Sequence, residues 1–476
     1  MSTITKEQED QVIKPVPILI SFLIAGFVGL FSETALNMAL NSLMKEFDIV
    51  SSTVQWLTTG YLLTLGILIP ISALLIQWFS TRKLFMASVI FSIVGTIVAA
   101  MAPVFWVLLV GRVIQAIGTG ILIPLMFNTV LLIFPINKRG TIMGLMGLVM
   151  MVAPAIGPAI SGLVLEKLSW NWIFWVTLPL LALALVAGSV YMQNVSKITK
   201  PKIDILSIIL STIGFGGLVY GFSVAGEKGW GSTIVIATIV VGLIALAIFS
   251  VRQLKMETPM LDLRAFKYPM FTLGVFSVFV TFMVILSSMI LLPMYLQGGL
   301  GLATLAAGLV LLPGGIVNGI MAPVMGRIFD MYGPRGLITP GFVIMMITLW
   351  GLSNLTTETS VMTIILLHSF LMIGVSMVMM PAQTNGLNQL PRELYPDGTA
   401  LLNTLQQVSG AIGTAVAIKI MSTSQTTYLN ELADPSSLTA ISESLTAGIQ
   451  TAFIFGLSLA VAGFIMSFFI RSSREI

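Results

Sequence analysis

The sequence predicts an all-α polytopic membrane protein with fourteen membrane-spanning helices. Hydrophobic residues make up 57% of the 476-residue chain and charged residues only 9%, whereas soluble domains carry about 25% charged residues. Apolar runs long enough to cross a bilayer recur from one end of the chain to the other. The first run does not read as a cleavable signal peptide, because it is too long and similar runs follow it.

The expected spans follow one another through mostly short connections. They cover residues 17–43, 53–77, 84–102, 104–130, 140–165, 172–191, 204–224, 233–252, 270–296, 303–326, 336–354, 360–381, 398–421 and 447–470. Each holds about 20 or more mainly apolar residues, the length that a helix needs to cross the hydrocarbon core. The longest connection on the side away from the termini, 422–446, is polar, and we expect an external loop there.

Positive charge is strongly one-sided along this topology. An even number of spans puts both termini on one side, and that side holds eighteen of the 23 Lys and Arg residues. The opposite loops hold only Lys45, Lys167 and Lys228, and Arg112 and Lys419 lie within spans. Because cytoplasmic loops carry the excess of Lys and Arg, we expect both termini in the cytoplasm and the chain as a multi-pass protein of the cell membrane.

Several chemistries are excluded by what the sequence lacks. The chain has no Cys, which excludes disulfides, iron–sulfur clusters and Cys-ligated zinc. Its one His, His368, cannot form a metal cluster or a catalytic triad. Neither a P-loop nor a dinucleotide-binding glycine motif is present. We therefore expect no enzyme activity, no cofactor and, despite a net charge of +4, no nucleic-acid partner; uphill work must draw on an ion gradient or a partner.

An internal repeat relates two loops that lie eight spans apart. The loop after the second span begins at Ala73, and the loop after the tenth begins at Gly326. Three further positions align between the loops: Gln77 with Asp330, Ser80 with Gly333, and Arg82 with Arg335. Such an offset predicts two six-helix bundles, 1–192 and 270–476, joined by a linker with two additional helices at 193–269. Transporters are commonly built from such repeats, with the substrate site between them.

Four local patterns, taken in order, resemble the fourteen-helix drug:proton antiporters of the major facilitator superfamily over essentially the whole chain. They are an acidic run at Glu33, Thr34, Asn37, Ala39 and Leu40, with Glu in place of the more usual Asp; Gly111, Arg112, Gln115, Gly118 and Gly120; the antiporter pattern at Gly157, Pro158, Ser161 and Gly162; and the loop motif at Gly326, Asp330, Gly333 and Arg335. Within the family the chain is similar to lincosamide-resistance-type exporters of Gram-positive bacteria. The resemblance implies the major facilitator fold, two six-helix bundles plus two extra central helices.

Glu33 is the one acid in a long apolar run, and we expect it to be the proton site. A charge at the centre of a bilayer helix costs about 2.5–3.5 kcal/mol on insertion scales and usually marks function. Glu33 lies about 15 Å and Arg112 about 12 Å from the external ends of their spans. The resemblance places both helices around one half of the cavity, so we expect an ion pair, direct or through water or Gln115.

The chemistry of such a pair favours a switch. Burial disfavours the charged form of a carboxylate, whereas a nearby Arg favours it, so the group can change its protonation when the exposure of the cavity changes. Asn37, one helical turn beyond Glu33, is expected to extend a polar track toward the exterior. The alternative is a permanent buried pair that only fixes helix packing.

Other side chains in or near the spans are candidates for contact with substrate, and each is otherwise a contact between helices. They are Gln55, Tyr61, Met150, Met151, Phe282, Tyr295, Gln297, Asn318, Met379, Met380, Asn385 and Gln407. Met and Phe suit lipophilic ligands of different shapes. The resemblance assigns gating or structural roles to Arg82, Gly157, Pro158, Asp330, Gly333 and Arg335.

The leading prediction is proton-coupled efflux of amphipathic drugs by alternating access, by a monomer whose partners are small molecules, protons and membrane lipids. Two alternatives stay open. One is export of an endogenous metabolite or bile-type anion, because the deep acid stands beside a deep Arg. The other is a lipid-handling membrane protein without proton coupling.

Overall fold

A computed structural model describes residues 14–431 and 437–472, and these residues form helices without any β-strand. The N-terminal group comprises α1 (Pro15–Ala35), η2 (Leu36–Ala39), α2 (Leu40–Glu46), α3 (Ser51–Val54), α4 (Trp56–Trp78), α5 (Thr81–Ala100), α6 (Phe105–Ile133), α7 (Ile136–Lys167), α8 (Asn171–Trp175) and α9 (Leu178–Tyr191). The central group comprises α10 (Ile205–Lys228), α11 (Thr233–Lys255) and η3 (Leu263–Lys267). The C-terminal group comprises α12 (Pro269–Met294), η4 (Tyr295–Gly299), α13 (Thr304–Tyr332), α14 (Arg335–Leu352), α15 (Val361–Gln389), η5 (Arg392–Leu394), α16 (Tyr395–Asn430) and α17 (Leu438–Ser467).

Thirteen helices in the described part of the chain are long and apolar enough to cross a membrane. The fourteenth expected span, 398–421, lies in α16, which runs in the same bundle but is less apolar. Its polar side chains are buried inside the protein, which explains why its composition differs from that of a lipid-facing helix. They include Thr399, Asn403, Thr404, Gln406 and Ser409. The all-α membrane fold that the sequence predicts is therefore present.

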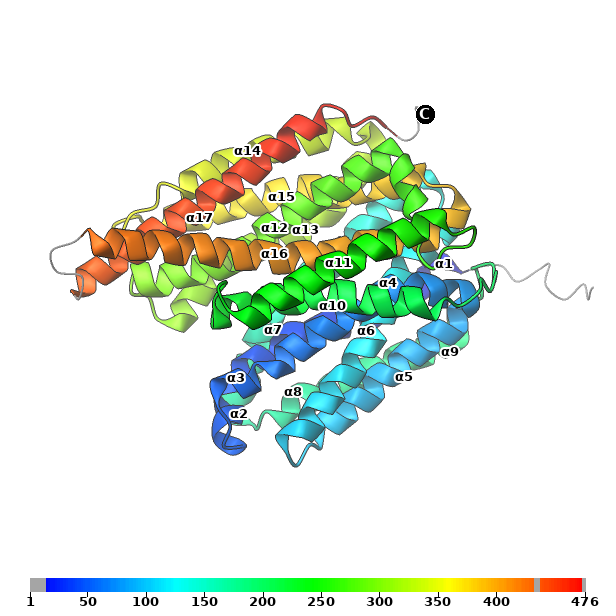
Figure 1. The fold of residues 1–476 in the computed structure, drawn as a ribbon, viewed down its shortest axis with the longest axis horizontal. Coiled ribbons are helices and arrows are strands. Elements are labelled where there is room, and N and C mark those ends of the chain that lie inside the picture. Colours follow the sequence, from blue (N-terminus) through cyan, green and yellow to red (C-terminus); the bar gives the residue numbers. More distant parts are fainter. Residues whose placement is uncertain (1–13, 432–436, 473–476) are drawn as a thin grey trace, which may run out of the picture.

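The two central helices lie between the other two groups (Figure 1). They pack on each other, and α10 also contacts α4 of the N-terminal group and α16 of the C-terminal group. The N-terminal and C-terminal groups meet directly as well, through α7 with α13 and through α16 with α4 and α6. The central pair thus bridges two groups that are already in contact.

The start of α1 and the end of α17 lie at the same end of the helix bundle (Figure 1). The loops with most of the Lys and Arg residues are at this end, and we call it the basic end, marked by Pro15 and Ser467. The loop expected at 422–446 is shorter than predicted, because α16 continues to Asn430 and α17 begins at Leu438. Residues 432–436 lie outside the described part.

Glycine lets α7 and α13 approach closely near the basic end. A Cβ atom on Gly144 would lie 2.5 Å from the carbonyl oxygen of Ala322, and one on Gly326 would lie 2.2 Å from that of Gly140. Farther from this end the helices are less close, since a Cβ on Gly315 would meet only the Cβ of Ala155, at 3.8 Å. Small residues permit such backbone contact between membrane helices. The N-terminal and C-terminal groups are therefore tightly closed at the basic end.

The first membrane helix is not continuous, although the sequence predicts one span over 17–43. It is α-helical to Ala35, tightens to a 3-10 helix over Leu36–Ala39 and resumes as α2 at Leu40. A 3-10 stretch inside a helix often marks a hinge or strain. The break follows two residues after Glu33, so the acid stands in the last turn of an α-helix.

Candidate functional site

Arg112 of α6 is the centre of a polar cluster among the N-terminal helices. Its side chain is 1% exposed. Nη1 donates to the carbonyl oxygen of Ser32 at 2.7 Å and to Oε1 of Gln115 at 3.2 Å, and Nε donates to the carbonyl of Leu57 at 3.4 Å. The Nη2 group is buried and has no hydrogen-bond partner in the described chain. One guanidinium thus joins α1, α4 and α6, and the two N–H donors of its Nη2 group have no partner among the described residues.

The break in α1 explains why Ser32 can accept this hydrogen bond. The last four carbonyl groups of an α-helix have no intrahelical donor, and Ser32 is the fourth residue from the end of α1 at Ala35. Arg112 supplies the missing donor from a neighbouring helix. The guanidinium is therefore held against the backbone of the residue that precedes Glu33.

Tyr61 of α4 forms the second layer of the cluster. The Arg112 guanidinium lies 4.3 Å from the centre of its ring, a cation–π contact. The Tyr61 hydroxyl lies 2.9 Å from both the carbonyl oxygen of Gly29 and Oγ1 of Thr119. A Cβ on Gly29 would come within 2.7 Å of Thr119 Oγ1, so the glycine allows α1 and α6 to approach. Tyr61, predicted to contact substrate, is fully buried inside this network in the structure.

Gln115 continues the cluster to α5. Its amide Nε2 donates to Oγ1 of Thr96 at 2.8 Å, and its Oε1 accepts from Arg112. Close α5–α6 packing places these groups together: a Cβ on Gly95 would lie 2.5 Å from the backbone nitrogen of Gln115, and one on Gly118 would lie 2.3 Å from Oγ of Ser92. The glycine spacing in the fourth span therefore serves helix packing around the Arg.

Glu33 lies beside this cluster and is half-buried. In the described part of the chain its carboxylate has no hydrogen bond, and no ion pair with Arg112 forms within 4 Å. The sequence predicts an ion pair that is direct or runs through water or Gln115; in this structure the guanidinium binds the Ser32 carbonyl and Gln115 Oε1, so the direct form is not made here. The guanidinium is nonetheless held against the residue that directly precedes Glu33.

The residue after Glu33 is anchored to α7. Pro158 has no backbone N–H, so the carbonyl of residue 154 loses its helical donor. The Thr34 hydroxyl donates to that carbonyl, on Pro154, at 3.0 Å. Gly157 leaves room for the contact, since a Cβ there would lie 2.4 Å from Thr34 Oγ1. Gly157 and Pro158, to which the resemblance assigns a gating or structural role, therefore lie at the contact of α1 with α7, directly beside Glu33.

Asn37 does not stand one α-helical turn beyond Glu33, because it lies in the 3-10 stretch η2. It is exposed, and its Oδ1 accepts a hydrogen bond from the Thr58 hydroxyl at 2.8 Å. This contact joins η2 to α4 at the end of the bundle away from the basic end. The polar track that the sequence predicts therefore does not continue as one helix face.

Three of the predicted substrate residues are held by contacts between helices. Asn318 of α13 donates to the Met372 carbonyl at 3.5 Å and lies 3.3 Å from its sulfur. Tyr295 donates to the Thr356 carbonyl at 2.6 Å, and Asn385 donates to a carbonyl at the C-terminal end of the described chain, at 2.9 Å. In this conformation these side chains stabilise packing.

The remaining predicted substrate residues are spread over several environments. Met150, Met379 and Met380 are buried, Met151, Phe282 and Gln407 are partly buried, and Gln55 and Gln297 are exposed. Met380 would meet a Cβ on Gly147 of α7 at 2.8 Å, and Phe282 faces Gly410 of α16. Met380 therefore lies where the N-terminal and C-terminal groups meet, and the others are not brought into one cluster.

Asp330 links the N-terminal and C-terminal groups at the basic end. Its carboxylate accepts from the backbone N–H groups of Gly140 and Thr141 at 2.8 and 2.7 Å, and from the Thr141 hydroxyl at 2.7 Å. These donors are the fifth and sixth residues of α7, in its second turn. The predicted gating residue thus binds the same helix that holds Thr34 farther along.

Arg139 is a second link at this end, and sequence reasoning missed it. It is 4% exposed. Its Nη1 donates to Oδ1 of Asn388 at 2.7 Å and to the Tyr395 hydroxyl at 3.2 Å, while Nε and Nη2 donate to carbonyls at the end of α6. The sequence shows it only as one of two adjacent loop cations, after Lys138. The sequence feature that could have identified Arg139 is its position in the first turn of α7, next to Gly140.

The Arg residues of the two repeated loops act alike. Arg82 Nη2 donates to the Ser189 carbonyl at 2.7 Å, and Arg335 Nε donates to the Ile470 carbonyl at 2.9 Å. Gly333 has a φ of +79°, a conformation that favours glycine. It ends α13 and turns the chain into α14.

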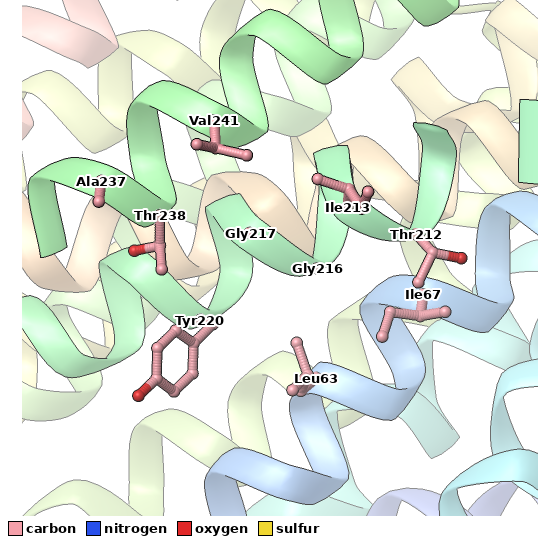
Figure 2. A pocket seen from close by; sticks show the side chains of 10 residues that line it. All are labelled: Leu63, Ile67, Thr212, Ile213, Gly216, Gly217, Tyr220, Ala237, Thr238 and Val241. Carbon is pink, nitrogen blue, oxygen red and sulfur yellow. The ribbon is translucent and has the colours of Figure 1, made fainter. Parts of the chain in front are cut away.

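A shallow apolar groove lies outside this cluster, between α4, α10 and α11 (Figure 2). Its volume is about 400 Å³. Its walls come from Leu63, Ile67, Thr212, Ile213, Gly216, Gly217, Tyr220, Ala237, Thr238 and Val241. No charged side chain lines it, so it offers apolar surface only. Among the described residues no group of His, Asp and Glu could hold a metal ion.

Comparison with solved structures identifies the fold. The human organic anion transporter MFSD10 aligns with 96% of this chain and 100% of its own, with a TM-score of 0.68 and 12% sequence identity. The proton:xylose symporter XylE aligns over 94% of both chains, with a TM-score of 0.62 and 12% identity. At such low identity the likeness shows the fold alone.

Sequence comparison identifies the family. The model of the Major Facilitator Superfamily matches residues 22–414. Lincomycin resistance protein LmrB of Listeria innocua is 64% identical and that of Bacillus subtilis 63%, each over 98% of this chain and 98% of the relative. Multidrug export protein EmrB of Haemophilus influenzae is 26% identical over 83% of this chain and 78% of its own. The chain therefore belongs to the major facilitator superfamily of membrane transporters, within the group of the lincomycin resistance proteins.

Proposed function

We propose that the protein exports amphipathic drugs, lincosamides among them, across the bacterial cytoplasmic membrane in exchange for protons. The observation that supports this most is the position of Glu33. It is a half-buried membrane carboxylate with no hydrogen bond among the described residues, and it lies beside a buried Arg112 whose Nη2 group has no partner there either. Intramembrane acids of this kind commonly serve proton relays. The relatives named for lincomycin and multidrug resistance supply the substrate class.

The proton step follows from the charges around Glu33. When the carboxylate is ionised, Arg112 balances it, and when a proton binds, the charge of Arg112 is left uncompensated in a buried cluster. Each protonation state therefore favours a different arrangement of α1 against α6. The 3-10 stretch that begins at Leu36, three residues after Glu33, gives α1 a place to bend. Glu33 is the proposed proton site, with Arg112 and Gln115 as its positioning partners.

Helix α7 connects this site to the closed basic end. Thr34 binds the Pro154 carbonyl in the middle of α7, and Asp330 binds Gly140 and Thr141 at its start. Fourteen residues separate Gly140 from Pro154, which is about 21 Å along a helix. A movement of α1 at Glu33 is thereby transmitted to the contact between α7 and α13. We assign to α7 the coupling between proton binding and opening.

The orientation of the cycle follows from the distribution of charge. The basic end holds most of the Lys and Arg residues and is therefore proposed to face the cytoplasm. In this structure the N-terminal and C-terminal groups are joined there by Asp330 and Arg139. The closed basic end corresponds to the state that releases drug outside and takes up a proton. Residues 1–192 and 270–476 are proposed as the two moving bundles.

The free energy that the membrane potential supplies is sufficient to drive drug export without ATP. A potential of 100 mV supplies about 2.3 kcal/mol for one charge. One proton exchanged for one neutral drug molecule then supports a concentration ratio of about fifty. That ratio lowers the internal concentration of an antibiotic enough to protect its target.

Transport into inverted vesicles with an imposed pH gradient tests this function. Wild type is expected to accumulate radiolabelled lincomycin, and Glu33→Gln is expected to lose gradient-driven accumulation while still binding drug. Glu33→Asp should retain transport, and Glu166→Gln, which removes an exposed acid, should behave as wild type. Full gradient-driven accumulation by Glu33→Gln would sink the proton assignment. Accumulation of bile-type anions in place of lincomycin would reassign the substrate.

A further inference from the structure

A second cavity, of about 520 Å³, lies on the other side of the central helices. It is formed where α10 and α11 meet the segment η3 and helix α16. Its lining is mostly apolar, with two cations at one edge: Phe215, Leu246, Phe249, Ser250, Leu254, Leu263, Arg264, Phe266, Lys267, Leu401, Thr404 and Leu405. Unlike the groove of Figure 2, it is therefore amphipathic.

The cavity extends from the basic end into the membrane. Arg264 and Lys267 belong to η3, which lies between the end of α11 and the start of α12. Phe215 belongs to α10, ten residues after its start at Ile205, which places it about 15 Å deeper along the helix. The apolar part of the cavity therefore lies at the depth of acyl chains, and the cations lie at the level of lipid headgroups.

The two cations have charge available for a ligand. Lys267 is exposed and makes no ion pair in the part of the chain that the structure describes. Arg264 donates through Nη2 to the Met256 carbonyl at 2.6 Å, and its Nε lies 3.8 Å from Oδ1 of Asp262. One loosely paired and one unpaired cation at the rim of an apolar cavity attract a negatively charged headgroup.

Thr404 provides an independent observation inside the cavity. It is 1% exposed, and its hydroxyl Oγ1 has no hydrogen-bond partner among the described residues. An unpaired hydroxyl in an apolar wall costs free energy unless a polar atom of a ligand reaches it. The ester oxygens of a glycerophospholipid, just below the headgroup, are acceptors of the required kind.

We propose that this cavity binds an anionic phospholipid from the membrane leaflet at the basic end. The phosphate lies at Arg264 and Lys267, an ester oxygen accepts from Thr404, and one acyl chain extends along Phe249 toward Phe215. A basic pocket between membrane helices with an apolar interior suits such a lipid. A free anion would leave the apolar part of the cavity empty, and a neutral drug would leave Lys267 unused.

The bound lipid would tie the central helices to α16. The segment beside η3 already contacts the start of α16, because the backbone N–H of Asp262 donates to Oδ1 of Asp397 at 2.8 Å. Helix α16 in turn packs against α4 and α6 of the N-terminal group. The lipid therefore occupies the place where the central pair meets a helix shared by the N-terminal and C-terminal groups.

Native mass spectrometry of the purified full-length protein, titrated with phosphatidylglycerol or phosphatidylcholine, tests the proposal. Wild type should retain one phosphatidylglycerol in preference to phosphatidylcholine. Lys267→Gln should weaken that retention about fivefold, the usual effect of one cation near an anionic headgroup, and Lys267→Arg should restore it. Lys255→Gln, which removes a nearby exposed cation outside the cavity, should leave retention unchanged.

A second pair of variants tests the acyl-chain part. Ser250→Phe places a ring in the cavity and should displace the lipid, whereas Ala247→Phe adds the same ring on an exposed part of α11 outside it. Equal retention of the two lipids by wild type, or equal losses in Lys255→Gln and Lys267→Gln, would overturn the proposal. So would displacement of the lipid by soluble glycerol phosphate, which has no acyl chain, or by lincomycin.

Discussion

The two repeated loops at the basic end share one function and differ in another. In both, the Arg binds a backbone carbonyl near the last helix of its own group: Arg82 binds Ser189 beside the end of α9, and Arg335 binds Ile470 beyond the end of α17. This shared contact closes each group on itself. It explains why the Arg is present in both copies even though the rest of the motif is degraded in the first.

The two copies of the loop motif differ at the acidic position. Asp330 binds the start of α7 in the opposite group. At the equivalent position, Gln77 contacts the connector that leads to the central helices. Its backbone carbonyl accepts from the N–H groups of Thr199 and Lys200, and its side-chain Oε1 accepts from the Thr199 hydroxyl at 3.4 Å. The first copy therefore holds the connector to the central helices, and only the second holds the N-terminal and C-terminal groups together. Of the two loop copies, only the second supplies an acidic contact between the groups, and Arg139 of α7 supplies the other link.

The largest effect is expected from Asp330→Asn. The variant loses a charged acceptor for three donors, and such hydrogen bonds contribute about 1.5–3 kcal/mol, so the closed basic end should become about 10 to 100 times less favoured. Because the chain has no Cys, spin labels on Lys138→Cys and Met331→Cys report the distance between α7 and α13. Gln77→Ala should leave that distance unchanged. An equal effect of both substitutions would remove the proposed asymmetry.

Gly326→Ala makes the second loop resemble the first, which has Ala73 at the aligned position. The added Cβ would lie 2.2 Å from the Gly140 carbonyl oxygen, so α7 and α13 must separate. Overpacking of this kind costs about 1–3 kcal/mol, and the same label distance should lengthen. Gly336→Ala, where nothing lies within 4 Å of an added Cβ, is the matched control. Normal closure in Gly326→Ala would show that the close approach is not needed.

Thr34→Val tests whether α7 connects the proton site to this asymmetric gate. It removes the hydroxyl that binds the Pro154 carbonyl at nearly constant volume, and a hydrogen bond between membrane helices contributes about 0.6–2 kcal/mol. We expect the rate of lincomycin transport driven by a given pH gradient to fall about 3- to 30-fold, while Asp330 still holds the basic end closed. Thr64→Val, which removes a hydroxyl bonded within its own helix, is the control. Equal transport in both variants would contradict the coupling.

The smallest effect is expected at the connector that the first loop holds. Arg252 binds Asp204 through Nε at 2.7 Å and Nη2 at 3.1 Å, and this lowers the pKa of Asp204 to about 2. The pair is partly exposed, so Asp204→Asn should lower the unfolding free energy by only about 0.2–1 kcal/mol. Since the folded pKa is depressed, the contribution of Asp204 is complete above the unfolded pKa near 4 and disappears as the pH falls toward 2.

Thermal unfolding followed by Trp fluorescence checks this last prediction. The difference between wild type and Asp204→Asn should be the same at pH 7 and pH 5 and should begin to shrink below about pH 4. The label distance at the basic end should not change, because the connector does not hold the N-terminal and C-terminal groups together. A longer distance in this variant would give the first loop a gating role after all.

The sequence predicts the helices well, because apolar run length and charge asymmetry directly reflect the membrane. It also predicts that Glu33 and Arg112 lie near each other, since their depths follow from helix rise. It does not predict which acceptor Arg112 binds. Backbone carbonyls have no signature in the sequence, and the Ser32 carbonyl becomes available only because α1 tightens into a 3-10 helix.

The same reason explains the two contacts of α7 that sequence reasoning missed. Pro158 indicates a kink, but only the structure shows that the carbonyl of Pro154, which has no helical donor, accepts a hydrogen bond from Thr34. Arg139 looks like an ordinary loop cation, and only the packing of α6, α7 and α15 shows that it is buried. Periodicity predicts which residues share a helix, whereas the partner across the interface depends on rotation and on where each helix bends.

The distance between labels at Lys138→Cys and Met331→Cys, measured as a function of pH with and without Glu33→Gln, tests the central claim most directly. If protonation of Glu33 acts through α7, the basic end of wild type should open as the pH falls. Glu33→Gln, which mimics the protonated acid, should be open at every pH. A pH response in Glu33→Gln equal to that of wild type would contradict the account.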